Sequence, residues 1–148
     1  MKFINTLLLA VAISVSVNCF ANSSRLSVKV NNIVGNQGVV RVAIFNNEKA
    51  FTDDDTSGKL AFKSCVKPPK ADSISCQFNL PYGTYAISLF HDKDKSDKLS
   101  TGWFGVPEEG YGFSNNPVKS GHASWNQAKF VVATPKQSML IHMLKDNA

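Results

Sequence analysis

The residues most capable of chemistry are concentrated in one stretch of the chain, residues 91–116. This stretch holds five of the eleven carboxylates and several aromatic side chains: Asp92, Asp94, Asp97, Glu108, Glu109, Trp103, Phe104, Tyr111 and Phe113. Disordered segments are poor in aromatic residues, so we expect residues 91–124 to form one long ordered loop. Aromatic faces and neighbouring polar groups can hold a small molecule, a glycan or a protein. The candidate contact residues are His91, Trp103, Glu108, Tyr111, Phe113 and Asn115.

The DKDKS run at 92–96 places side-chain oxygens at alternate positions. Calcium loops use this spacing because alternate residues of a tight turn converge on one ion. Asp92, Asp94 and Ser96 are therefore candidate calcium ligands, and a calcium-stabilised structural module is one functional hypothesis. The run is not an EF-hand, because Asp97 stands where the loop needs glycine and Trp103 where it needs glutamate. A hydrogen-bonded turn around the aspartates is the alternative.

An enzymatic hypothesis needs groups that exchange protons. His91, Asp92 and Glu108 are the candidate acid–base groups of a hydrolase-type enzyme, provided that they share one concave pocket. Ser114 lacks the G-x-S-x-G frame of a hydrolase nucleophile, and the three histidines do not have zinc-site spacing. We therefore assign no catalytic residue and no cofactor other than calcium, and we expect a non-enzymatic binding module that uses the loop at 91–124.

Short runs of alternating apolar and polar residues predict the strands that must position this loop. The alternation is clearest at 26–31 and 74–80. The remaining strands are expected at 39–45, 59–66, 84–90, 129–133 and 139–144. About seven strands without an amphipathic helix predict an all-β fold, a single antiparallel β-sandwich of the transthyretin (prealbumin) or immunoglobulin type. A turn at 36–38 predicts that the first two strands form a hairpin.

The N-terminus has the features of a secretory signal peptide. Lys2 precedes an apolar run at 7–17 that is too short to span a bilayer, and a small-x-small pattern ends at Ala21. Cleavage after Ala21 would leave 22–148 as one domain in the periplasm or outside the cell, without a membrane span. A lipoprotein attached through Cys19 is the alternative, although Asn18 is an unusual residue before a lipidated cysteine.

The chain that remains after cleavage has two cysteines and a modest positive charge. In an oxidising compartment Cys65 and Cys76 have one intramolecular pairing, and a ring of this size stabilises the fold by about 3 kcal/mol. The lysines and arginines are scattered along the chain rather than gathered in a stripe with interleaved aromatics, so we expect no nucleic-acid partner.

The chain resembles the bacterial domain of unknown function 2141 family. The resemblance rests on Gly83, Tyr85 and Ala86, on the His91-Asp92 pair, on FGVPEEGYGFSNN at 104–116 and on the stretch at 124–130. It covers nearly all of the mature chain and implies an exported protein with a transthyretin-like or related sandwich. The family's turn after the histidine resembles D-x-N-x-N-G-K-L-D, whereas this chain has Asp97 and Ser100 at its glycine and last aspartate. The Tyr-Arg-Gly-Ser ending of transthyretin-like hydrolases is missing, so the resemblance implies no such activity.

Overall fold

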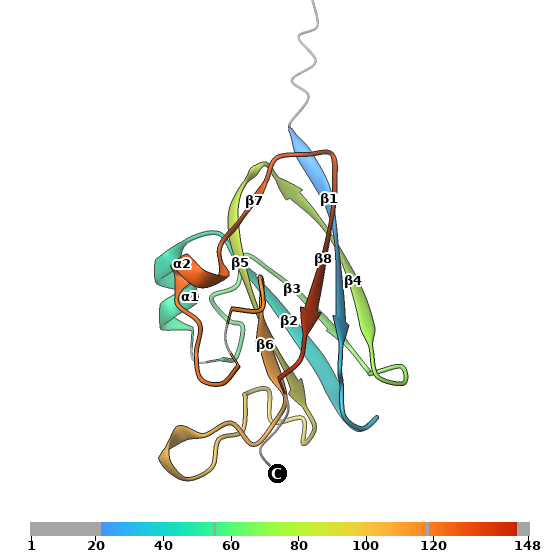
Figure 1. Ribbon diagram of the computed structural model, residues 1–148, viewed down its shortest axis with the longest axis vertical. Coiled ribbons are helices and arrows are strands. Elements are labelled where there is room, and N and C mark those ends of the chain that lie inside the picture. The colour runs from blue at the N-terminus through green and yellow to red at the C-terminus, as the bar shows by residue number, and fades with distance from the viewer. Residues whose placement is uncertain (1–21, 55, 118, 145–148) are drawn as a thin grey trace, which may run out of the picture.

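The computed structural model describes residues 22–54, 56–117 and 119–144 (Figure 1). The signal peptide predicted at 1–21 lies outside the described residues. Within these described ranges the structure has eight strands, two short α-helices and one 3-10 turn: β1 (Ser23–Asn31), β2 (Val39–Phe45), α1 (Glu48–Asp53), β3 (Lys63–Lys67), β4 (Ile74–Pro81), β5 (Gly83–Asp92), η1 (Trp103–Gly105), β6 (Tyr111–Phe113), α2 (Trp125–Ala128), β7 (Phe130–Val132) and β8 (Lys136–His142). None of the helices in the described part of the chain is long and apolar enough to cross a membrane.

The strands form two sheets packed face to face, which confirms the predicted all-β sandwich (Figure 1). The smaller sheet has the order β4-β1-β8, and the larger has the order β3-β2-β5-β6, with β7 also paired to β5. One pairing departs from the antiparallel prediction, because β1 and β8 run parallel. The assignment to the transthyretin or immunoglobulin type stays a prediction.

The predicted hairpin between the first two strands is wrong. β1 pairs with β4 and β8, whereas β2 pairs with β3 and β5, so residues 32–38 carry the chain from one sheet to the other. Gly38 has a φ of +67°, and a Cβ there would lie 2.0 Å from the backbone oxygen of Asp92. Gly38 therefore allows the backbone to pass close to the end of β5. The glycine that suggested a hairpin turn in the sequence is equally suited to this crossing between the sheets.

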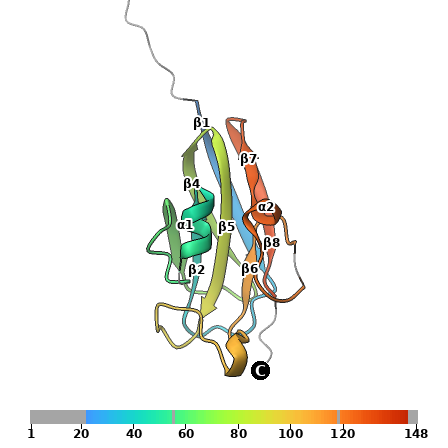
Figure 2. The same ribbon diagram turned by 90° about the vertical axis from the view of Figure 1, so that its left-hand side faces the viewer.

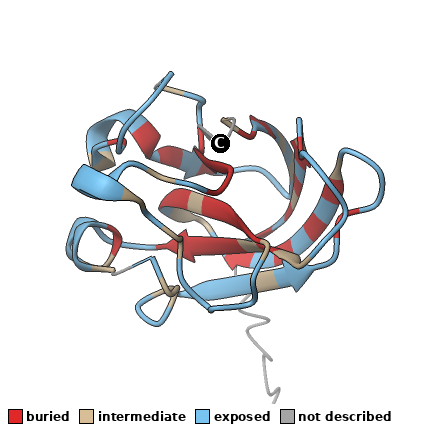
Figure 3. Cartoon of the chain, turned by 90° about the horizontal axis from the view of Figure 1, so that it is seen from below, coloured by how far each residue is buried: buried red, intermediate tan, exposed pale blue. Residues whose placement is uncertain are grey.

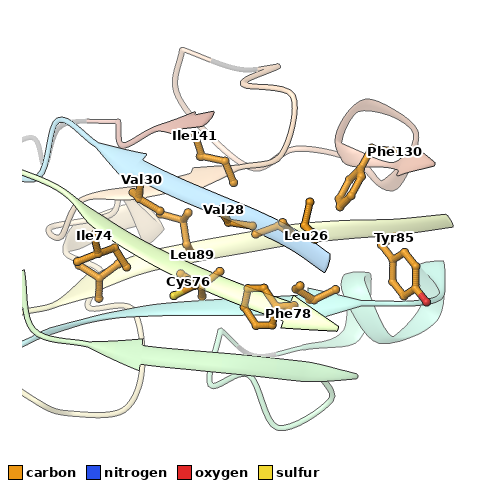
Figure 4. Packing of buried hydrophobic residues seen from close by; sticks show 14 of the residues in the cluster. Leu26, Val28, Val30, Ile74, Cys76, Phe78, Tyr85, Leu89, Phe130 and Ile141 are labelled. Atoms are coloured by element: carbon orange, nitrogen blue, oxygen red, sulfur yellow. The ribbon is translucent and has the colours of Figure 1, made fainter. Parts of the chain in front are cut away.

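The core between the sheets is built from alternating side chains. Every second residue of β1 and β4 is buried, as the strands striped red and pale blue in Figure 3 illustrate. Leu26, Val28 and Val30 of β1 pack with Phe78 of β4 and Leu89 of β5 in one apolar cluster (Figure 4). This is the pattern expected of strands with one buried face.

The disulfide pairing predicted from the sequence is present. Cys65 of β3 is bonded to Cys76 of β4, and the two Cα atoms lie 6.3 Å apart. β3 and β4 are edge strands of different sheets. The bond therefore joins the two sheets along one open side of the sandwich.

The central strands β2 and β5 of the larger sheet are covered on both faces, because a second apolar cluster lies on their outer side. Nearly all of β5 is buried, and α1 and α2 lie over the face that points away from the smaller sheet (Figures 1 and 2). Asn47 caps α1 by accepting a hydrogen bond from the backbone N–H of Ala50 at 2.9 Å. Phe51 of α1 then packs edge-on against Phe45 and Phe113. This second layer builds the candidate site.

Candidate binding cavity

A cavity of about 440 Å³ lies on the outer face of the larger sheet. The strand register explains it. Ala43 of β2 is paired with Ser64 of β3 on one side and Ser88 of β5 on the other, so three small side chains lie in one row across the sheet, and the row ends at Phe113 of β6. The next row is much larger: Val66, Arg41, Phe90 and Tyr111. A layer that rests on the large residues cannot fill the space above the small ones.

Loops and α1 form the walls. The 54–58 loop and the 99–107 loop meet where the backbone N–H of Leu99 donates to the Thr56 hydroxyl at 3.2 Å. On the opposite side, the backbone N–H of Gly121 donates to the Tyr111 hydroxyl at 2.7 Å. These bonds hold the segments around the cavity floor in place. The residues that line the cavity from these segments and from α1 and β6 are Phe51, Thr52, Asp54, Ser57, Leu99, Thr101, Gly105, Pro107, Phe113 and His122.

One corner of the cavity is aromatic. The ring centroid of His122 lies 5.7 Å from that of Phe51 in a stacked arrangement and 5.1 Å from that of Phe113 in an edge-on one. Burial lowers the pKa of His122 below the ordinary imidazole value of 6.5. The imidazole is therefore neutral at pH 7 and behaves as part of an apolar wall with one polar edge.

The opposite end carries an ion-pair network. The Arg41 guanidinium donates through Nε to Asp92 Oδ2 at 2.6 Å and through a terminal nitrogen to Asp97. The Asp92 side chain is fully buried, and its two oxygens also accept the backbone N–H groups of Ser96 and Asp97 at 2.9 and 3.2 Å. The end of β5, the start of the loop and β2 are thereby fastened together.

Two of the predicted calcium ligands lie in an acidic cluster. One carboxylate oxygen from each of Asp92, Asp94 and Glu109 lies within 4.8 Å of the others. The cluster is rich in hydrogen bonds, since Glu109 accepts the backbone N–H groups of Lys93 and Ser100 at 2.7 and 3.0 Å. The hydroxyl of Ser96, the third predicted ligand, donates instead to the backbone oxygen of Lys98 at 3.0 Å.

The three candidate acid–base residues lie apart from the cavity. His91 is 1% exposed, and its Nε2 lies 2.7 Å from the backbone oxygen of Gln37, which ties the 32–38 crossing to β5. Asp92 is engaged by Arg41 as described above, and Glu108 is exposed. None of the three lines the 440 Å³ cavity.

The predicted contact residues divide into three groups. Tyr111 and Phe113 line the cavity. Trp103 stands at the tip of the loop and is 88% exposed, next to Phe104, which was not in the predicted set and is 100% exposed. Asn115 has a structural role, because its amide donates to the backbone oxygens of Gln127 and Lys129 at 3.1 and 2.9 Å.

Most of the cavity residues were absent from the prediction: Arg41, Ala43, Phe51, Ser64, Ser88 and His122. Some of these cavity residues could have been predicted from their immediate neighbours in the sequence. Ala43 and Ser88 are small residues in strands that are otherwise strongly apolar. Residues of this kind leave space wherever a second layer covers a sheet.

The comparisons with known proteins place the chain in a family. The model of a family described as "Uncharacterized protein conserved in bacteria (DUF2141)" matches residues 28–139. No curated protein and no solved structure matches the chain. The family match spans most of the chain and includes β2, β3, β5 and the 91–124 segment, which together build the cavity. The protein therefore belongs to the DUF2141 family.

Proposed function

We propose that this protein is an exported, non-enzymatic binding module that holds a small molecule in the cavity on the outer face of its larger sheet. The observation that carries the proposal is the open space of about 440 Å³ above the Ser64–Ala43–Ser88 row. Small-molecule sites are concave, largely apolar, pre-formed and about 300–1,000 Å³ in volume. The cavity meets each of these criteria, since aromatic rings form its walls and backbone hydrogen bonds hold the loops that enclose it.

Export rests on separate support. Residues 1–21 have the charged, apolar and small-residue regions of a signal peptide. The Cys65–Cys76 disulfide suits the oxidising periplasm or extracellular space, where such bonds persist. The proposed ligand is accordingly one that a bacterium meets or carries outside its cytoplasm.

A fluorescent apolar probe, N-phenyl-1-naphthylamine, tests the site. It should bind the mature protein saturably, and Ser64→Phe should weaken this binding at least tenfold, because the new ring projects into the cavity from an exposed edge strand. Ser75→Phe is the matched control, since Ser75 is an exposed serine in β4, the edge strand of the other sheet. Unchanged affinity in Ser64→Phe, or no saturable binding by the wild-type protein, would refute the proposed site.

The exposed loop tip needs its own control, because Trp103 and Phe104 could hold the probe by themselves. The double variant Trp103→Ser with Phe104→Ser removes both exposed rings and leaves the residues of the cavity floor in place. Its affinity for the probe should match that of the wild-type protein. A loss of binding in this variant would move the site from the cavity to the tip.

The acidic cluster supports a second candidate function, calcium-dependent stabilisation. Its basis is the approach of the Asp92, Asp94 and Glu109 oxygens to within 4.8 Å of one another. Calcium that binds the folded protein alone must raise its melting temperature by mass action. Thermal unfolding after chelator treatment, with and without millimolar calcium, tests this function. A rise that Asp94→Ala abolishes would establish it, and an unchanged melting temperature would reject it.

A further inference from the structure

We propose that the cavity selects uncharged ligands and excludes anions, so that its natural ligand is a neutral, flat, largely apolar molecule with one or two hydrogen-bonding groups. This inference rests on the proposed function and adds the chemical class of the ligand. It is drawn from the charges around the cavity, the bonds that engage them and the arrangement of hydroxyl and aromatic side chains.

Few charged side chains line the cavity. Among the described residues that line the cavity, Arg41 is the only cationic side chain and Asp54 the only carboxylate. Arg41 is already held between the carboxylates of Asp92 and Asp97. Among these four side chains, one cation therefore stands with three carboxylates, so together they present a net negative charge to an anionic ligand.

The charged groups of Arg41 and Asp54 already have hydrogen-bond partners within the protein. Nε of Arg41 points to the buried Asp92 oxygen at 2.6 Å, and a terminal nitrogen is taken by Asp97. The Asp54 carboxylate accepts the backbone N–H groups of Gly58 and Leu60 at 3.0 and 3.2 Å. A ligand anion would have to give up its water and compete with Asp92 and Asp97 for the guanidinium. Burial of a charge without a partner is strongly unfavourable.

The other side chains that line the cavity can make van der Waals contacts with a ligand and a small number of hydrogen bonds to it. The rings of Phe51 and His122 are stacked, and Phe113 meets both of them edge-on, so the three rings form an aromatic corner. Phe90 and Tyr111 lie in the row of the sheet next to the small residues. Ser64 and Ser88 place hydroxyl groups on the floor on either side of Ala43. A ring system can lie on such a floor and direct a hydroxyl, carbonyl or amine group to a serine.

Two probes with one skeleton test the charge selection. N-phenyl-1-naphthylamine and 1-anilinonaphthalene-8-sulfonate share the same fused ring and anilino group, and they differ by one sulfonate. The neutral probe should bind the mature protein at least ten times more tightly than the sulfonate at low ionic strength. Ser64→Phe should weaken both probes, which assigns both signals to the cavity.

The variant Asp97→Asn tests the cause of the selection. Asp97 has a φ of +65°, a conformation that asparagine also tolerates, and the substitution removes one of the two charges that engage Arg41. The sulfonate should gain affinity in this variant, and the gap between the two probes should narrow. Salt should reduce the gap in the wild-type protein for the same reason.

The outcomes separate this inference from the function on which it rests. Equal or tighter binding of the sulfonate, with Ser64→Phe still weakening both probes, would overturn the charge selection and leave the binding site in place. If the two probes differ in affinity as much in Asp97→Asn as in the wild-type protein, the carboxylates that engage Arg41 are not the cause of the charge selection. Absence of saturable binding by either probe would overturn the binding function itself.

Discussion

Ser114 links β5 to α2. Its buried hydroxyl accepts the backbone N–H of Ile87 in β5 at 2.9 Å and donates to the backbone oxygen of Ala128 in α2 at 2.5 Å. Asn116, two residues later, binds the free edge of β8, where its amide donates to Leu140 and its oxygen accepts from His142. The Gly-Tyr-Gly-Phe-Ser-Asn-Asn run is therefore a structural junction in this protein.

Ser114→Ala should destabilise the protein by about 1 to 3 kcal/mol, because it leaves the Ile87 N–H and the Ala128 carbonyl without this partner in a buried place. Urea unfolding of the mature protein measures the change. Ser120→Ala, at an exposed position, is the control and should leave the unfolding midpoint unchanged. Equal midpoints for both variants would contradict the role of Ser114.

His122 gives the fold a pH dependence with a defined sign. Because burial lowers the pKa of its imidazole in the folded state, the unfolded chain binds a proton more readily below the ordinary value of 6.5. The stability linked to His122 is thus present above pH 6.5 and is lost as the pH falls through the folded-state pKa. His122→Phe keeps an aromatic ring against Phe51 and Phe113 and removes the proton-binding group. The unfolding midpoint of this variant should fall less between pH 7.5 and 5 than that of the wild-type protein, and parallel curves would contradict the account.

At the scale of single residues, part of the candidate site could be predicted. Tyr111 and Phe113 belong to the predicted contact set and do line the cavity. The glycines beside them are required by close packing and not by turn geometry. Gly110 and Gly112 have no positive φ, and a Cβ would approach Met143 Sδ to 2.7 Å at Gly110 and the His142 carbonyl oxygen to 3.2 Å at Gly112. Their purpose is close packing against the end of the chain, which depends on tertiary contacts that a local pattern does not contain.

At the scale of elements, the Arg41–Asp92 pair joins β2 to the loop that follows β5. Asp92 is fully buried, so loss of its partner leaves a desolvated carboxylate with backbone donors alone. We expect Arg41→Met to lower the free energy of unfolding by about 3 kcal/mol. Urea unfolding at neutral pH measures this loss.

The matched control for Arg41→Met is Lys49→Met. Lys49 pairs with Asp53 on the surface of α1, where water screens the interaction, so this change should leave the unfolding midpoint unchanged. If both lysine and arginine variants unfold at the wild-type midpoint, the buried pair does not hold the loop as described. A large loss of unfolding free energy in Lys49→Met would show that the exposed pair stabilises the protein as much as the buried one, contrary to the prediction.

The elements differ in how far the sequence predicts them. β1 and β4 alternate cleanly, and both were predicted near their observed bounds. α1 and α2 have six and four residues, which is too short for a helical period to show in the sequence. β6 has three residues inside the predicted loop and is a strand only because β5 offers a free edge at Ser88–Phe90. β3 begins at Lys63 rather than 59, since the preceding residues form a turn against β2.

At the scale of the molecule, the sandwich supplies a rigid floor and the second layer supplies the walls of the site. Patterning of the strands predicts the sandwich, because burial of one face imposes a period of two. The cavity brings together β2, β3, α1, residues 54 and 56–58, β5, the 99–107 loop, β6 and residues 121–122. These segments are far apart in sequence, so their meeting depends on strand order and register, which neither composition nor local periodicity encodes. The observed topology departs from the predicted one at the crossing from β1 to β2 between the sheets and at the parallel pairing of β1 with β8.

The most direct test of the central claim is a two-dimensional 1H–15N NMR titration of residues 22–148 with N-phenyl-1-naphthylamine. The account predicts the largest saturable amide shifts at the cavity floor and walls, at Ala43, Ser64, Ser88, Thr101 and Gly121. Amides of the smaller sheet, such as those of Ser27 and Ser75, should remain in place. Shifts confined to Trp103–Gly105, or no saturable shifts at all, would contradict a binding site on the outer face of the larger sheet.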